Sequence, residues 1–180
     1  MSYNKKTVWI FNGLLTGLLF LGLIGCSEKK PEGMPKLQPV VLTVTQDGNP
    51  LPEAIVTLKP LDSSNKWSSG GTTDSNGKLV VVTHQKYKGA PLGKYKVSVS
   101  KIVGEGTPPP PTPIDEKSAK VYQDYIDSGA TYEQFQVVEA QYRLVSTTPL
   151  EIEITDATQE ITIEAGTAVR EKIDQGRGVL

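Results

Sequence analysis

The chain has 180 residues, with 19 lysines and arginines against 20 aspartates and glutamates. This length suits one domain with appendages, and the nearly balanced charge argues against a basic nucleic-acid surface. The single cysteine excludes a disulfide within the chain.

Residues 1–25 are expected to form a lipoprotein signal peptide. Lys5 and Lys6 precede an apolar run from Val8 to Ile24, which is the order of regions in a secretory signal. The alternative is an uncleaved transmembrane anchor, but a run of about 17 residues is shorter than the roughly 20 that span a bilayer.

The end of this run resembles a bacterial lipobox, in which a small residue precedes the cysteine that receives the lipid. Its residues are Leu23, Ile24, Gly25 and Cys26. The position of the chain's only cysteine here favours lipidation of Cys26. Burial of acyl chains contributes about 0.8 kcal/mol per CH₂, so two or more chains hold a protein firmly at a membrane.

The expected location is therefore the cell envelope, with the membrane as a partner through the lipid anchor. Ser27 follows the cysteine, where enterobacterial lipoproteins retained at the inner membrane carry aspartate, so the outer membrane is predicted. Residues 26–38 are polar and contain Pro31, Gly33 and Pro35. They are expected to form a flexible tether.

Residues 39–166 are expected to form an all-β domain, a seven-stranded antiparallel β-sandwich. Seven ranges are expected to be strands. In the first two, the fifth and the last two of them, apolar and polar residues alternate, a period that predicts strands with one face on a core. The seven ranges are about 40–46, 54–60, 68–73, 78–83, 93–101, 150–155 and 160–164. Asp47-Gly48 and Asn76-Gly77 supply hairpin turns, and short strands separated by turns favour two packed sheets.

Residues 104–145 interrupt this pattern as an insertion before the last two strands. A proline-rich segment, 107–113, predicts extended polyproline II structure, and Thr112 is expected to cap a helix over 113–127. Apolar residues recur on one face of that helix, which predicts docking on the sandwich; they are Ile114, Val121, Tyr122, Tyr125 and Ile126. The polar tail, 167–180, is expected to be a frayed end or short helix.

No catalytic residue, metal site or cofactor is predicted. His84 is the only histidine, whereas a zinc site needs three or four ligands. The pairs Glu151/Glu153 and Glu160/Glu164 are expected to lie on the solvated face of a sheet.

Trp67 is the one lead for ligand binding. It lies in a loop of Ser, Asn and Gly residues, where an exposed indole could stack on a sugar ring. The alternative is that Trp67 caps the open end of the core.

Three segments carry a family resemblance: DGNPLPEAIVTLKP from Asp47, GGTTDSNGKLVVVT from Gly70, and GAPLGKYKVSVSK from Gly89. Together they resemble the carboxypeptidase regulatory-like domain, a transthyretin-like β-sandwich, and more closely the small lipoproteins of that type that are abundant in planctomycete bacteria. The resemblance covers roughly residues 39–165 and includes the late segment Ser146–Leu150. Glu53 departs from the pattern, because glycine is usual there.

The resemblance implies a fold but says little about activity. Together with the anchor, it predicts a non-enzymatic structural or interaction module that binds an envelope protein or polysaccharide. A carbohydrate-binding module at the cell surface, using Trp67, is the alternative.

Overall fold

The structure is a computed structural model that describes residues 30–157 and 159–174. The chain divides into two units, Met1–Gly33 and Met34–Leu180, and every element named below belongs to the second unit. The predicted signal peptide, including Leu23, Ile24, Gly25 and Cys26, lies outside the described residues, as does the end of the tail from residue 175.

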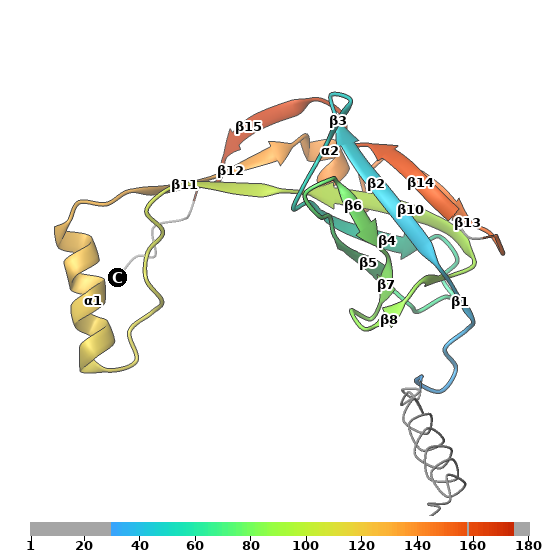
Figure 1. Cartoon of the computed structure of the whole chain (residues 1–180), viewed down its shortest axis with the longest axis horizontal. Helices are drawn as coiled ribbons and strands as arrows, with labels where there is room; N and C mark the ends of the chain where they lie inside the picture. The colour runs from blue at the N-terminus through green and yellow to red at the C-terminus, as the bar shows by residue number, and fades with distance from the viewer. Residues whose placement is uncertain (1–29, 158, 175–180) are drawn as a thin grey trace, which may run out of the picture. The chain divides into compact units, whose positions relative to one another are not determined.

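The largest sheet has six strands in the order β13-β10-β4-β5-β7-β8, and all its neighbouring strands are antiparallel (Figure 1). Its strands are β4 (Ile55–Pro60), β5 (Ser69–Thr72), β7 (Val82–Thr83), β8 (Tyr87–Lys88), β10 (Gly93–Ser100) and β13 (Glu151–Ile154). Side chains alternate between buried and exposed along β4 and β13, so one face of this sheet lies on the core.

The facing sheet has four strands: β2 (Val40–Gln46), β3 (Asn49–Pro50), β6 (Lys78–Val80) and β14 (Gln159–Glu164). β2 pairs antiparallel with β3 and β6, but β14 runs parallel to β2. The prediction of purely antiparallel pairing was therefore wrong at this edge. An alternating pattern sets which face of a strand is buried and says nothing of the direction of its neighbour.

The remaining elements lie outside these two sheets. A three-stranded sheet contains β11 (Ile102–Gly106), β12 (Tyr132–Val138) and β15 (Ala168–Lys172), all antiparallel. β1 (Leu37–Gln38) pairs with β9 (Ala90–Pro91). The helices of the described residues are α1 (Glu116–Asp127) and α2 (Ala140–Arg143).

One apolar core joins the two larger sheets. Val40, Leu42 and Val44 of β2 are buried in the same cluster as Val56 and Leu58 of β4, and further members come from β10, β13 and β14. The alternation predicted for these strands from sequence matches the burial observed. The architecture is predominantly β, with mostly antiparallel sheets and two short helices in the described part of the chain.

The predicted set of seven strands was too simple. The described residues contain fifteen short strands, and the predicted strand 78–83 is two of them, because the chain crosses from one sheet to the other at Val81. Its N–H donates to the carbonyl of Val40, in β2, and its carbonyl accepts from Gly89. The part of the predicted tail that the structure describes contains β15, which pairs with β12, and so is neither frayed nor helical.

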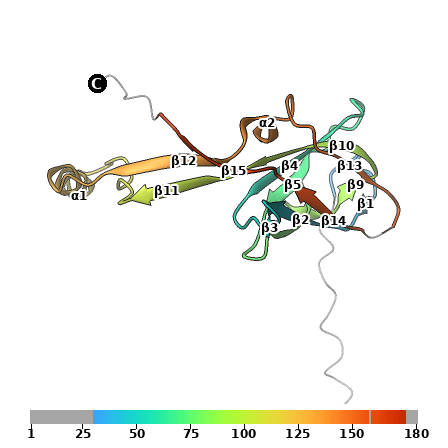
Figure 2. The ribbon, with the colours of Figure 1, turned by 90° about the horizontal axis from the view of Figure 1, so that it is seen from above.

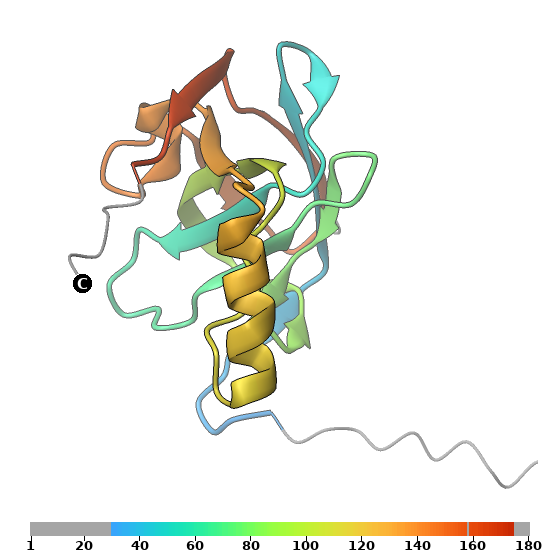
Figure 3. The same cartoon turned by 90° about the vertical axis from the view of Figure 1, so that its left-hand side faces the viewer.

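The helix begins later than predicted and does not dock. Asp115, not Thr112, is the N-cap: its carboxylate accepts from the Ser118 N–H at 2.7 Å, and the Ser118 hydroxyl accepts from the Asp115 N–H at 3.0 Å. No residue of α1 is buried. Figures 2 and 3 show α1 joined to the rest of the domain through β11 and β12.

Candidate functional site

The outer face of the six-stranded sheet carries a pocket of about 590 Å³, a size typical of small-molecule sites. It lies over β4, β5 and β7, and its lining ends at the turn that connects β7 to β8. The side chains around it are Ile55, Thr57, Ser68, Thr72, Val82, His84 and Gln85.

The pocket exists because a side chain is missing from the middle of the sheet face. Gly70 lies between Thr57 of β4 and Val82 of β7 in the register of the strands. A Cβ at Gly70 would lie 2.2 Å from the carbonyl oxygen of Val56, so the close approach of two strands requires glycine here. The depression is therefore a consequence of backbone packing.

The turn between β7 and β8 presents two side chains at the mouth of the pocket. His84 and Gln85 both adopt left-handed backbone conformations, with φ of 52° and 57°. This conformation costs an L-residue roughly 1–2 kcal/mol, and such strain gathers at functional sites. The base of the turn is fixed by Thr83, whose hydroxyl lies 2.9 Å from that of Ser69 and donates to the carbonyl of Gly89 at 2.7 Å.

Trp67 supports this turn from the side. Its indole is half-buried, and the ring centroids of Trp67 and His84 are 4.8 Å apart with the planes tilted by 47°. Trp67 is not among the residues of the apolar core cluster. It does not line the pocket either; its nearest aromatic contact is the imidazole that does.

The exposed face of α1 is a second candidate surface. Within α1, Val121 is 51% exposed and Ile126 53%, and Ile114, just before the N-cap, is 92% exposed. Tyr125 donates from its hydroxyl to the Thr107 carbonyl at 3.0 Å, which ties the helix to the start of the proline-rich segment. The same apolar residues were identified from sequence, but their expected docking partner, the sandwich, does not cover them.

Charged residues of the three-stranded sheet pair with one another across strands. Arg170 of β15 forms a bidentate pair with Glu105 of β11, with the second contact at 2.7 Å, and its guanidinium lies 3.7 Å from the ring centroid of Phe135. The hydrogen bonds from Arg170 hold the pKa of the Glu105 carboxyl below its usual value. These pairs attach β15 and offer no free cation cluster.

Two further carboxylates, Asp74 and Glu151, form structural contacts. Asp74 accepts from the N–H groups of Asn76 and Lys78 and so closes a hairpin. Glu151 pairs with Lys96 at 2.9 Å. Over residues 30–157 and 159–174, no group of three or more His, Cys, Asp or Glu side chains could hold a metal ion, and no helix has the length and apolar character to cross a membrane.

The sequence matches no family model and no curated protein. Among solved structures, the major pilin subunit of Bacillus cereus is 19% identical over 73% of this chain and 30% of that chain, with a TM-score of 0.36. A 9R-lipoxygenase from Cyanothece is 16% identical over 76% of this chain and 18% of that chain, with a TM-score of 0.29. The chain thus spans less than a third of the length of either, and both likenesses are weak.

The class that the structure defines is a predominantly β domain. The sequence pointed to Trp67, but the side chains that line the pocket were missed. The Ser-Gly-Gly run at 68–71, inside a strand pattern, was the available signal, because glycine in a strand often marks a close approach of backbone or ligand.

Proposed function

We propose that this protein is an envelope lipoprotein anchored through Cys26, whose β domain is a non-catalytic interaction module. The observation that carries the proposal is the uncovered apolar face of α1. The pocket supplies a single titratable side chain, His84, which is little for acid–base catalysis, and this favours binding over chemistry.

We further propose that the two facing sheets form a transthyretin-like sandwich of the kind found in carboxypeptidase regulatory-like domains. Support comes from the order of the three sequence motifs and from their places in the fold. The first motif leads into β4, the second begins within β5 and contains β6 and β7, and the third contains β10. The resemblance of residues 23–26 to a lipobox supports a location at the envelope, and the outer membrane is the membrane that we propose.

The partner that would bind the apolar face of α1 is a groove or helix of another envelope protein. An amphipathic helix binds such a groove through apolar residues three, four and seven positions apart. In α1, Val121 and Tyr125 are four positions apart, as are Tyr122 and Ile126. The charges on the helix are mixed, two lysines against three carboxylates: Lys117, Lys120, Glu116, Asp124 and Asp127. This mixture disfavours an anionic lipid surface, which attracts clusters of basic residues.

Site-specific crosslinking in the native envelope tests this proposal. Cys26 is the only cysteine and is expected to be acylated, so a cysteine introduced at Val121 or Ile126 would be the only free thiol to carry a photoreactive benzophenone. The expected result is a crosslink from both positions to one segment of one protein, mapped by mass spectrometry.

Thiols at Lys120 and Gln123, on the polar side of α1, provide the matched controls and should give no such product. Equal products from all four positions, or none from any, would contradict the proposal. A crosslink between two copies of this chain would assign the face to self-association instead of a different protein.

A further inference from the structure

The pocket over Gly70 displays hydrogen-bonding side chains that the domain itself does not use. Thr57 and Thr72 project from the outer face of the sheet, and Gln85 stands at its mouth. Within the described part of the chain, none of these three side chains forms a hydrogen bond. A hydroxyl and a carboxamide each donate and accept, so the pocket can match a ligand that does both.

Among the described residues that line the pocket, His84 is the one titratable side chain. No aspartate, glutamate, lysine or arginine lines it, and a buried ion without a counter-charge is costly. The apolar part of the lining comes from Ile55, which is 57% exposed, and from Val82. The surface therefore combines neutral polar groups with an aliphatic patch, and the ligand should do the same.

A peptide fits this surface less well than a sugar does. Extended peptides bind at sheet edges, where unpaired backbone groups extend the ladder, whereas β5 has β4 on one side and β7 on the other. A sugar ring needs no backbone partner. Its hydroxyls pair with side chains, and its C–H face can rest on aliphatic groups.

The strained turn is the second, independent observation. His84 and Gln85 hold left-handed conformations in succession, and the Trp67 ring contacts the imidazole of His84. An outlier of this kind, with its side chains on a pocket, points to function. From these features we infer that the pocket is a binding site for a neutral saccharide, with Gln85 and the two threonines as its polar contacts. This surface is distinct from α1, so either proposal can fail alone.

Calorimetric titration of the full chain, held in a polyoxyethylene detergent that contains no sugar, tests the inference. The probes are neutral cello-, xylo- and malto-hexaose, with an oligogalacturonate of similar length as the anionic comparison. Trp67 and Trp9 are the two tryptophans. Because Trp9 lies in the signal peptide that is predicted to be removed, Trp67 emission in the mature chain is a second readout next to His84. We expect saturable heat and a matching emission change with at least one neutral hexaose and none with the oligogalacturonate.

The decisive variant is Gln85→Gly, which removes the side chain and relaxes its backbone, so folding is preserved. It should weaken binding about three- to tenfold, the range expected for one lost hydrogen bond. Glu53→Gly is the matched control, because Glu53 also has a left-handed backbone, with φ of 55°, and lies outside the pocket; its affinity should be unchanged.

Three results would overturn the inference. These are no saturable heat with any neutral hexaose at millimolar concentration, equal binding of the anionic oligomer, or an affinity that Gln85→Gly leaves unchanged. Each leaves the crosslinking result at α1 unaffected, so the two proposals remain separable.

Discussion

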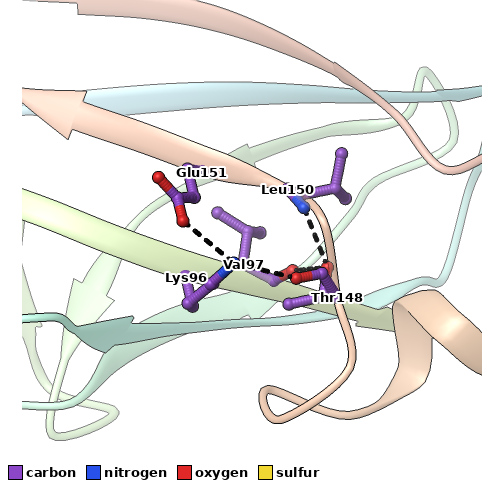
Figure 4. A network of polar contacts seen from close by, with 5 residues as sticks. All are labelled: Lys96, Val97, Thr148, Leu150 and Glu151. Carbon is purple, nitrogen blue, oxygen red and sulfur yellow. Dashed lines mark hydrogen bonds and ion pairs between the residues drawn. The ribbon is translucent and has the colours of Figure 1, made fainter.

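Thr148 shows how a single hydroxyl holds a late segment of the chain to the central sheet. Its Oγ1 donates to the Val97 carbonyl at 2.7 Å and accepts from the Leu150 N–H at 3.2 Å, and its own carbonyl accepts from the Lys96 ammonium at 3.1 Å (Figure 4). Thr148 is only 2% exposed. The network therefore sets where β13 begins beside β10.

Replacing this hydroxyl by a methyl group should destabilise the fold. Thr148→Val keeps the shape of the side chain and leaves the Val97 carbonyl buried without this partner, a change that costs about 1–3 kcal/mol. Thr148→Ser keeps the hydroxyl and should lose less. Equilibrium unfolding in urea measures both, and a larger loss in Thr148→Ser than in Thr148→Val would show that packing of the methyl group, and not the hydrogen bond, dominates.

Glu53 is a local departure from the family pattern that the structure explains. Its φ of 55° is a conformation that glycine adopts without steric cost, which agrees with glycine being usual at this place. Glu53→Gly should raise the free energy of unfolding by about 0.5–1 kcal/mol, the relief of strain being partly offset by the greater entropy of glycine in the unfolded chain. Glu53→Ala retains the strain, so a similar gain in that variant would point to the charge instead.

Among the elements, α1 has no buried residue, so its stability depends on the contacts at its two ends. A helix of 12 residues is marginal when isolated in water, so the capping box at Asp115 and the Tyr125–Thr107 contact matter more than in a buried helix. Asp115→Ala should speed amide exchange in the first turn of α1 and leave the global unfolding midpoint unchanged. Hydrogen exchange resolved by peptide measures the first effect, and a shifted midpoint would show that α1 is coupled to the core.

The same cap gives the helix a defined response to acid. Hydrogen bonds from the Ser118 hydroxyl and N–H lower the pKa of Asp115 below its ordinary value of 3.8. Because the folded-state pKa is depressed, the stabilisation is fully present above the unfolded value and is lost as pH falls through the folded one. Exchange in the first turn should therefore rise only below about pH 4, and the rise should be absent in Asp115→Ala.

The ranges of strands could be predicted from the sequence where one face of the strand is buried and the other exposed. β2, β4 and β13 each bury every second side chain, and their ranges could be predicted to within a residue or so. β11 and β15 have mostly exposed side chains and lack that signal; cross-strand pairs such as Glu105–Arg170 hold them instead. The pocket was not predicted from the sequence either, because it forms where Gly70 has no side chain, and a missing side chain leaves no pattern of apolar and polar residues.

At the scale of the whole molecule, a lipid anchor would change how strongly the two proposed contacts hold the protein at the envelope. A lipid anchor confines the domain near the membrane, where a weak contact is repeated at high effective concentration. If both proposed contacts form, weak binding at the α1 face and at the pocket would add to the attachment that the anchor supplies. This interpretation depends on lipidation of Cys26, which is a prediction from the sequence.

Cys26→Ala tests that dependence directly. In cells fed a clickable palmitate analogue, the unaltered chain should carry the label, whereas Cys26→Ala should remain an unlabelled precursor near its full 19.5 kDa. Membrane fractionation alone would not decide the matter, because a precursor that keeps its apolar run also sediments with membranes. The label distinguishes the two forms of attachment, and Ser27→Ala, which leaves Cys26 in place, should be labelled like the original. Labelling that persists in Cys26→Ala would refute the lipobox, and absence of label from the original chain would favour an uncleaved anchor.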